Sequence, residues 1–143
     1  MDLVNYKELI FNKGTEITSA IHKKVYDKLR VHGIYPGQPE LLLLIHYNEG
    51  IIQKELSSMN STNESTIAIM LKKMEQGGYI ERRVNAKDKR ALEVHLTEKG
   101  RDLVDICEKC LCEIRDEIFQ NFTDEDYNEI LRFLNKLQEN VKN

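Results

Sequence analysis

Apolar and small residues recur at steps of three and four along residues 3–32, with charged residues between them. The recurring positions are Ile10, Gly14, Ile17, Ile21, Val25 and Leu29. This spacing matches the turn of an α-helix and places the side chains on one face. The pattern predicts a long amphipathic helix over residues 3–32, stopped by Gly33 and followed by a turn at Tyr35-Pro36-Gly37.

Two shorter helices are predicted before residue 60. Pro39 suits the first turn of a helix through the sequence PELLLLIHYN, which is apolar on every side of its middle and therefore belongs in the core. Gly50 interrupts this helix. Residues 51–58 then predict a third helix, with Ile52 and Leu56 facing inward.

A fourth helix is predicted to begin near Asn63 and to end at Gly77-Gly78. The run Ser61-Thr62-Asn63-Glu64 offers a capping box, and Asn63 is itself a good N-cap, so both registers begin the helix at nearly the same place. Its core-facing stripe consists of Ile67, Met70, Leu71 and Met74. The opposite side is small, weakly polar and basic, and contains Ser65, Ala68, Ile69, Lys72, Lys73 and Gln76. Met59, Met70 and Met74 are predicted to fill the core.

Beyond Gly77-Gly78 the apolar positions alternate instead of following a helical period. Ile80 and Val84 face one way, and Glu81 and Arg83 face the other. After the tip sequence NAKDKR, a return strand alternates Leu92, Val94 and Leu96 with Glu93 and His95. The pattern predicts a two-stranded β-hairpin whose tip runs from Asn85 to Arg90.

Two further helices are predicted after the hairpin. Thr97 is an N-cap candidate for the fifth, and Thr123 opens a capping box for the sixth, with Phe122 and Tyr127 as a hydrophobic staple. The element order is ααααββαα. The predicted fold class is mainly α with a two-stranded β-hairpin wing, which is the pattern of a winged helix-turn-helix DNA-binding protein.

Composition agrees with a soluble, mostly helical protein of one compact domain. Of the 143 residues, 41% are apolar and 31% are charged, and no run reaches the length of a membrane span. The first residues lack the layout of a signal peptide. We therefore expect a cytoplasmic protein whose three cysteines are reduced.

The net charge of −3 hides an uneven distribution along the chain. Residues 53–101 carry a net charge of +3, whereas residues 102–143 carry −6. Because binding to phosphates depends on a local positive surface, the middle of the chain is the segment that suits nucleic acid.

The outward side of the fourth helix is a candidate DNA-reading surface, since a small and basic face can enter a major groove. Its candidate contacts are Asn63, Ser65, Thr66, Ile69, Lys72 and Lys73. Hydroxyls at the helix N-terminus can meet phosphates or base edges. Ile69 has two interpretations: it contacts a thymine methyl group, or it packs against a neighbouring helix.

The hairpin supplies a second candidate surface, formed by Arg83, Lys87, Asp88, Lys89 and Arg90, with Arg82 also contributing charge. One interpretation is a solvated basic turn. The other, favoured by its position after the fourth helix, is a wing that follows the DNA backbone and reaches into a minor groove. Asp88 is placed to hold the Arg90 guanidinium through a charge-assisted bond.

Several spaced motifs resemble the MarR family of bacterial transcription regulators. They are Pro36-Gly37-Gln38-Pro39, Glu55-Leu56, Thr66-Ile67, Met74-Glu75, Gly78, Arg83, Asp88-x-Arg90 and Leu96-Thr97-Glu98-Lys99-Gly100. The motifs cover about residues 33–101. Helix order and length extend the resemblance to the whole chain.

The resemblance implies one MarR-like domain over residues 1–143, with a winged helix-turn-helix core at 35–100 and a helical dimerisation region at 1–34 and 101–143. It implies a homodimer that binds a pseudo-palindromic operator in double-stranded DNA and represses. It also implies a small-molecule effector that binds between the dimerisation and DNA-binding regions. Arg90 takes the place of the family's wing arginine.

The chain departs from the family pattern at two places. Asn60, Ser61 and Thr62 replace an apolar turn, which predicts weaker anchoring of that turn in the core. Ala68 and Ile69 stand where Thr and Arg are frequent, which predicts weaker DNA binding or an unusual operator sequence.

Cys107, Cys110 and Cys112 form C-x2-C-x-C in the fifth helix. Packing as small apolar side chains, redox sensing and metal binding are all compatible with this spacing. The histidines are scattered, and no nucleophile triad or phosphate loop is recognisable, so we expect neither an enzyme nor a cofactor.

The leading prediction is thus a sequence-specific DNA-binding regulator, a dimeric repressor relieved by a small molecule. The alternatives are a protein-interaction module that kept the fold but lost DNA reading, and a thiol- or metal-responsive variant of the regulator. A dimer is also expected because the first, fifth and sixth helices carry more apolar surface than one small domain can cover. No membrane partner is expected.

Overall fold

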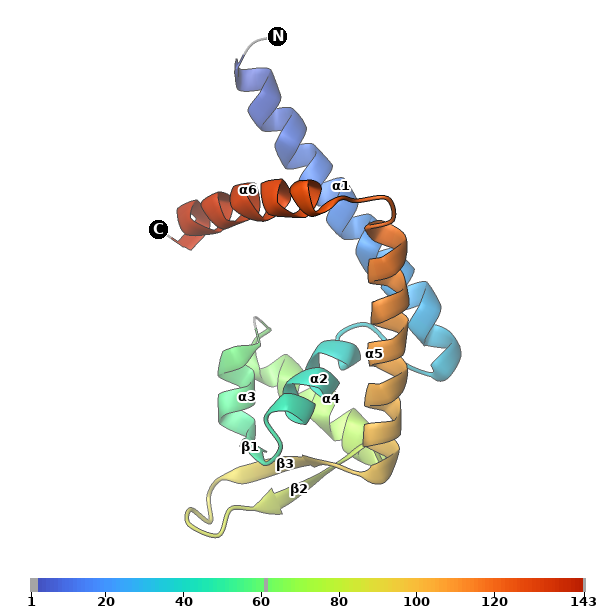
Figure 1. Cartoon of the computed structure of the whole chain (residues 1–143). Helices are drawn as coiled ribbons and strands as arrows, with labels where there is room; N and C mark the ends of the chain where they lie inside the picture. The colour runs from blue at the N-terminus through green and yellow to red at the C-terminus, as the bar shows by residue number, and fades with distance from the viewer. Residues whose placement is uncertain (1–2, 61, 143) are drawn as a thin grey trace. The chain divides into compact units, whose positions relative to one another are not determined.

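The computed structural model describes residues 3–60 and 62–142, which form two compact units, the first ending at Leu111 and the second beginning at Cys112. The helices are α1 (Leu3–Leu29), α2 (Gln38–Tyr47), α3 (Gln53–Met59), α4 (Glu64–Gln76), α5 (Glu98–Ile118) and α6 (Asp124–Lys142), with a short 3-10 helix η1 (Arg30–His32) after α1. The strands are β1 (Ile51–Ile52), β2 (Ile80–Val84) and β3 (Leu92–Leu96) (Figure 1). The predicted mainly helical fold with a β-hairpin is confirmed.

The apolar stripe of α1 divides into a buried end and an exposed end. Leu29 is buried in the core of the first unit, whereas Ile10 and Ile17 are 60% and 56% exposed. The α-helix ends at Leu29, short of the predicted residue 32, because the next residues tighten into η1. Gly33 closes η1 with a φ of 74°, a conformation that favours glycine, so the predicted stop is confirmed.

One hydrophobic core joins α2, α3, α4, the sheet and the first half of α5. Its fully buried members include Leu41, Leu42, Ile45, Leu56, Ile67, Leu71, Val94, Val104 and Cys107. The α2 helix is buried as its apolar sequence predicts. Met74 is buried and Met70 packs against the core, but Met59 is 52% exposed, so the core position predicted for Met59 is wrong.

Ile51 and Ile52 form strand β1 rather than the beginning of the third helix, so the helix predicted over residues 51–58 is corrected to Gln53–Met59. Ile51 pairs with Val94 of β3, and the sheet has three antiparallel strands in the order β1-β3-β2. Two β-branched residues suit this buried, extended position. The turn before them depends on Gly50, whose φ is 81°.

The hairpin formed by β2 and β3 has the predicted alternation, but its loop is one residue longer than the predicted tip from Asn85 to Arg90. Ile80 lies opposite Leu96 and Val84 lies opposite Leu92, which leaves a loop from residue 85 to 91. Figure 1 shows the hairpin alongside α2, α3 and α4, with its loop at the end away from α5. Because side chains alternate along a strand, Arg82 shares the face of Ile80 and Val84.

The hairpin meets α5 at a tight joint. Thr97 caps α5, as predicted: its Oγ1 accepts the Gly100 N–H (3.0 Å) and donates to the Gly78 carbonyl (2.5 Å). A Cβ added at Gly100 would overlap the Tyr79 carbonyl oxygen and lie 3.2 Å from Leu96 Cδ2. Glycine is required here by close backbone approach.

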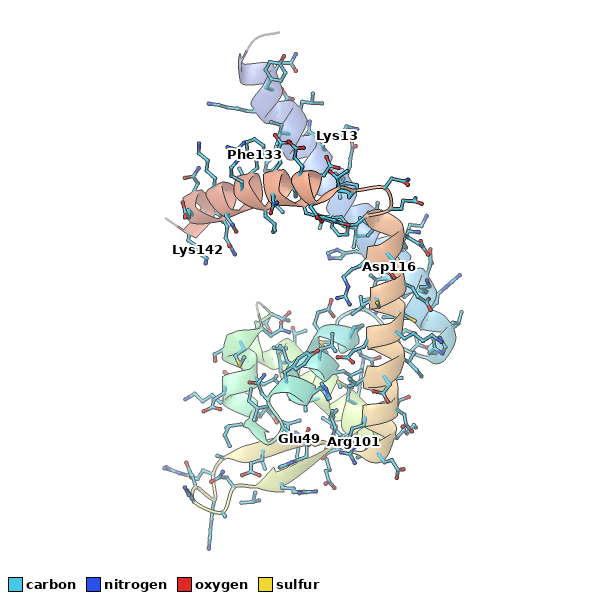
Figure 2. The ribbon with its side chains drawn as sticks, in the orientation of Figure 1. Lys13, Glu49, Arg101, Asp116, Phe133 and Lys142 are labelled. Atoms are coloured by element: carbon cyan, nitrogen blue, oxygen red, sulfur yellow. The ribbon has the colours of Figure 1, made fainter. Side chains whose placement is uncertain are left out.

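The start of α6 has the predicted capping box. The Thr123 N–H and hydroxyl both donate to Asp126 Oδ2 (2.8 Å), and the Asp126 N–H donates to Thr123 Oγ1 (3.2 Å). These bonds lower the pKa of Asp126, chiefly through the Thr123 backbone N–H. Phe122 and Tyr127 lie with ring centroids 5.8 Å apart, which confirms the predicted staple. Figure 2 shows the side chains of α6, Phe133 among them, standing out from the ribbon.

None of the helices within residues 3–60 and 62–142 is long and apolar enough to cross a membrane.

Candidate nucleic-acid interface

The N-terminus of α4 is fixed by Asn63. Its Oδ1 accepts the Thr66 N–H (2.9 Å), and its backbone carbonyl accepts the Ile67 N–H (3.1 Å). Asn63 is therefore the N-cap of α4, which confirms one of the two predicted starting positions. The other predicted start depends on Ser61, which lies outside the described residues. Since the cap occupies Oδ1, the Asn63 Nδ2 group is the part of this side chain that can face a ligand.

The outward side of α4 is exposed, as the position of its core-facing stripe predicts. Ser65, Lys72, Lys73 and Gln76 are exposed, and Thr66 and Ala68 are half-buried. Ile69 is 57% exposed, so within this chain it does not pack against a neighbouring helix. Its contact with a thymine methyl group stays a prediction.

The turn before α4 is closed by a polar side chain instead of an apolar one. Asn60 Oδ1 accepts the Thr62 N–H (3.0 Å), and the Asn60 N–H donates to the Leu56 carbonyl (3.1 Å). Hydrogen bonds of Asn60 therefore stabilise this turn.

The hairpin loop is ordered by two short polar side chains. Asn85 Oδ1 accepts the N–H groups of Lys87 and Asp88, both at 2.9 Å. Asp88 Oδ1 accepts the Arg90 N–H (3.0 Å). Such bonds are typical of Asx turns, which shape a loop without regular structure.

The predicted charge-assisted bond between the Arg90 guanidinium and Asp88 is weaker than expected. Arg90 Nε lies 3.5 Å from Asp88 Oδ1, while the Arg90 side chain is 94% exposed. The shorter bond goes to the backbone N–H of Arg90, so Asp88 orders the loop more than it fixes the guanidinium. Lys87 and Lys89 are likewise exposed. The tip thus presents three cations to solvent.

Arg83 differs from the tip cations because its guanidinium pairs with Glu81 on the same strand. Both side chains remain about half exposed, at 59% and 47%. A phosphate would have to compete with this carboxylate for Arg83, which makes Arg83 the weakest of the predicted wing contacts.

Arg82 has an internal role that the sequence pattern did not reveal. Its Nη2 donates to Glu75 Oε2 (2.6 Å) and its Nη1 to Gln53 Oε1 (3.4 Å), so it ties β2 to both α4 and α3. The bond from Arg82 lowers the pKa of Glu75 and raises the pKa of Arg82 itself. Arg82 lies on the same face of β2 as the buried Ile80, and this position in the sequence could have indicated its internal role.

A hollow of about 740 Å³ lies between the hairpin loop and the beginnings of α3 and α4. Charged side chains of both signs line it: Lys54, Arg90, Glu55, Glu64 and Asp88. The hollow separates the two predicted contact surfaces. Its carboxylates make the surface between them less positive than the hairpin tip.

Comparisons with known proteins identify this arrangement. Residues 34–92 match the model of the MarR family. The chain is 27% identical to the HTH-type transcriptional regulator YybA of Bacillus subtilis over 106 residues, or 74% of this chain and 71% of that protein. It superposes on a MarR transcriptional regulator from Methanosarcina mazei with a TM-score of 0.80 and 29% identity, over 94% and 96% of the two chains. The chain carries a MarR-family domain.

A second solved structure extends the likeness of fold. A mutant MarR from E. coli, complexed with operator DNA, superposes with a TM-score of 0.81 at 22% identity, over 96% of this chain and 99% of that one. The family and its named relatives are transcription regulators. The MarR-family chain is accordingly a DNA-binding transcription regulator and not an enzyme, as the sequence predicted.

The cysteines of the MarR-family chain lie along α5. Cys107 and Cys110 are buried at 0% and 7% exposure, Cys112 is exposed, and all three are free thiols. Burial raises the pKa of Cys107 to about 11. No group of three or more His, Cys, Asp or Glu side chains in the described part of the chain is arranged to hold a metal ion. The geometry favours packing for Cys107 and Cys110.

Alkylation of the folded protein checks this assignment. With iodoacetamide at pH 8, we expect Cys112 to be labelled quickly and Cys107 to be protected, because the buried thiol stays protonated far above neutral pH. Mass spectrometry of the peptides measures the labelling, and labelling in denaturant is the control. Fast labelling of Cys107 in the folded protein would restore the thiol-sensor interpretation.

A cavity of about 420 Å³ lies between α1 and the turn that leads into α2. Its walls are mainly apolar, and the lining includes His22, Val25, Tyr26, Leu29, Ile34 and Tyr35. Cavities of this size and character accept small organic molecules.

Proposed function

We propose that the protein is a dimeric repressor that inserts α4 into the major groove of a pseudo-palindromic operator and lays its hairpin along the backbone into a minor groove. The observation that carries the proposal is the exposed side of α4 beside an ordered loop whose Arg90 is 94% exposed. An Arg extended on an ordered loop suits a narrow minor groove. A mutant MarR from E. coli that shares this fold is complexed with operator DNA, which supports DNA as the partner.

In this proposal the contacts on α4 are Ser65, Thr66, Ile69, Lys72 and Lys73, together with the Nδ2 group of Asn63. Those on the hairpin are Lys87, Lys89 and Arg90, with Asp88 as the residue that orders the loop and Arg83 as a weaker contact. Hydroxyls and the two lysines contact phosphates, which positions the helix. Ile69 contacts a thymine methyl group and contributes to sequence specificity.

Binding to DNA from upstream of the protein's own gene tests the proposal. Fluorescence anisotropy at low salt is expected to show saturable binding to one fragment, with weaker binding to a scrambled fragment of equal length. The affinity should fall linearly with salt on logarithmic axes, because counterions are released from phosphates. Absence of binding at low salt by a folded protein would favour the protein-interaction module, for which the exposed Ile69 and the carboxylates Glu55 and Glu64 provide a surface.

The dimer is proposed from the apolar faces of two helices. In α1 the exposed apolar side chains are Tyr6, Leu9, Ile10, Phe11 and Ile17, and in α6 they are Leu131, Phe133, Leu134, Leu137 and Val141. Apart from Phe11 in α1, the side chains of each set lie within one half of their helix, and apolar surfaces of this extent normally find a partner. A second copy covers them in a closed dimer with two-fold symmetry.

Mass measurement tests the dimer. Light scattering coupled to gel filtration is expected to give twice the 16.7 kDa of one chain at micromolar concentration. Leu134→Glu places a charge in the proposed interface, so it is expected to shift the mass toward one chain. Glu139→Gln, at an exposed polar position of the same helix, is the control. A wild-type mass of one chain would contradict the dimer.

We propose that a small molecule relieves repression by binding in the cavity between α1 and the turn that leads into α2. Val25, Leu29 and Ile34 offer apolar walls, and Tyr26 and His22 offer hydrogen-bonding groups, so a compact amphipathic molecule would fit. An occupant there contacts both α1 and the approach to the DNA-binding core. Differential affinity of the effector for the free and DNA-bound forms is the physical requirement for release.

A further inference from the structure

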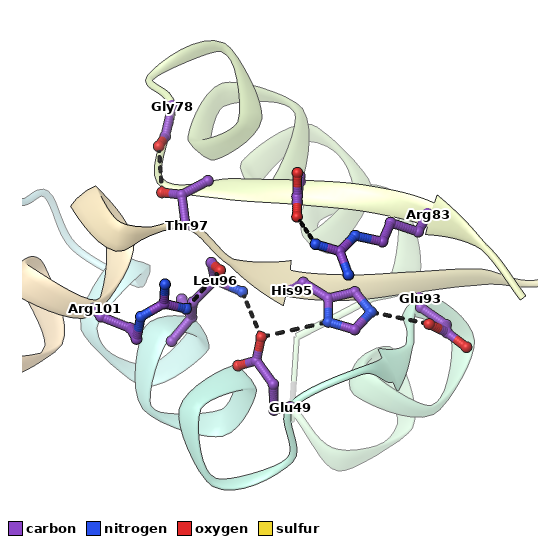
Figure 3. Close-up of polar contacts among 9 residues, drawn as sticks. Glu49, Gly78, Arg83, Glu93, His95, Leu96, Thr97 and Arg101 are labelled. Carbon is purple, nitrogen blue, oxygen red and sulfur yellow. Dashed lines mark hydrogen bonds and ion pairs between the residues drawn. The ribbon is translucent and has the colours of Figure 1, made fainter.

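A continuous chain of polar contacts runs from the end of α2 to the hairpin loop. Glu49 Oε1 lies 3.4 Å from His95 Nδ1, and His95 Nε2 lies 2.9 Å from Glu93 Oε2. Glu93 Oε1 then accepts a bond from Asn85 Nδ2 (2.7 Å). Figure 3 shows Glu49 and Glu93 on opposite sides of the His95 ring. The members come from the α2–β1 turn, β3 and the base of the loop.

The chain is anchored at the Glu49 end. Glu49 Oε1 also accepts the Leu96 N–H (3.0 Å), which attaches its carboxylate to β3 (Figure 3). The turn packs against the imidazole, since a Cβ added at Gly50 would lie 3.2 Å from His95 Cε1. The His95 side chain is only 18% exposed. The ring is therefore held in one orientation between the two carboxylates.

The orientation of Asn85 follows from its partner. The His95 bond, and then the Asn85 bond, lower the pKa of Glu93, which keeps its carboxylate ionised and able only to accept. Asn85 must then turn its Nδ2 group toward Glu93 and its Oδ1 toward the loop. Oδ1 is the atom that accepts the N–H groups of Lys87 and Asp88. Asp88 in turn accepts the Arg90 N–H.

We propose that Glu49, His95, Glu93 and Asn85 are positioning residues, which hold the hairpin loop in the conformation that presents Arg90 to DNA. The inference rests on the proposed function. It deepens that function, because the conformation of the hairpin loop is then set by side chains that do not themselves contact DNA. Reduced disorder of the loop before binding lowers the entropic cost of placing Arg90 in a groove.

The central test reverses the direction of one hydrogen bond. Asn85→Asp keeps an acceptor for the loop N–H groups but removes the donor and sets two carboxylates against each other. We expect about tenfold weaker DNA binding. Adding Glu93→Gln supplies a donor from the other side and restores the wild-type net charge. The double variant is expected to bind within about twofold of the wild type.

Ala86→Asp is the matched control, because it adds the same charge to the same loop at an exposed position outside the chain of contacts. Its loss of affinity is expected to be about twofold, from electrostatics alone. Equal losses for Asn85→Asp and Ala86→Asp would overturn the positioning role, as would a double variant that stays as weak as Asn85→Asp.

A second readout works without DNA. Backbone 15N relaxation of Lys87 and Asp88 is expected to show an ordered loop in the wild type, fast motion in Asn85→Asp and order again in the double variant. Unchanged loop order in Asn85→Asp would overturn the inference. If the loop amides respond as expected but no fragment of DNA binds the wild type, the proposed function fails while the ordering of the loop by this chain of contacts stands.

Discussion

Gly100→Ala is expected to destabilise the first unit by about 3 kcal/mol, a large share of the stability of a small domain. The added methyl group would overlap the Tyr79 carbonyl oxygen and lie 3.0 Å from the Tyr79 carbonyl carbon. These are backbone atoms, and they are held in place: the Tyr79 oxygen accepts the Thr97 N–H (3.1 Å), and the Tyr79 N–H donates to Met74 (3.0 Å). This overlap could be removed only if the beginning of α5 separated from the hairpin.

Urea unfolding followed by circular dichroism measures this loss. Gly14→Ala is the matched control, because Gly14 lies inside α1 and a Cβ there would meet nothing within 4 Å in the chain. That change is expected to be stabilising by about 0.5–1 kcal/mol, since alanine favours the helix. Because Gly14 shares a face with Ile10 and Ile17 of the proposed dimer interface, this variant and the wild type are compared at equal concentration after light scattering has shown that they have the same mass. A Gly100→Ala protein as stable as the wild type would show that the joint between the hairpin and α5 can open without cost.

Arg90→Ala is expected to weaken operator binding about tenfold or more while leaving the fold and the dimer intact. The Arg90 side chain is 94% exposed, so its removal leaves no cavity and no buried partner. If Arg90 contacts one phosphate, the slope of log affinity against log salt should also shrink by about 1. Anisotropy titrations at several salt concentrations measure both quantities.

Arg30→Ala is the control for Arg90→Ala, because it removes the same charge from an exposed position outside α4 and the hairpin. We expect it to change affinity little. Equal effects of the two substitutions would reduce the role of Arg90 to general electrostatic attraction. An unchanged affinity in Arg90→Ala would remove it from the DNA interface altogether.

The proposed dimer would hold two copies of α4 at a fixed distance, which requires rigid links inside each chain. The Gly100 joint connects the hairpin to α5, and the Arg82–Glu75 ion pair (2.6 Å) connects the hairpin to α4. Both links lie within the first unit. They fix the hairpin relative to α4, as the proposed contact of both elements with DNA requires.

Local patterns in the sequence predicted much of this architecture. The α4 stripe, the Asn63 and Thr97 caps and the Thr123 capping box depend on residues three or four positions apart. The alternation along the two hairpin strands follows in the same way, whereas the loop between them is one residue longer than predicted. Helical and strand periodicity are properties of neighbouring residues, so the sequence carries them directly.

Partners distant in the sequence were decided by the tertiary structure alone. Strand β1 exists because β3 lies beside it, and Arg82 turned inward because Glu75 and Gln53 lie within its reach. The sequence by itself determined the helices, the hairpin and the exposed basic tip of this MarR-family chain. Only the tertiary structure decided which charges pair internally, as Arg82 does, and which, as Arg90 does, remain extended toward solvent. The physical reason is that an ion pair depends on distance in space, and side chains of the same type are equivalent until the fold sets those distances.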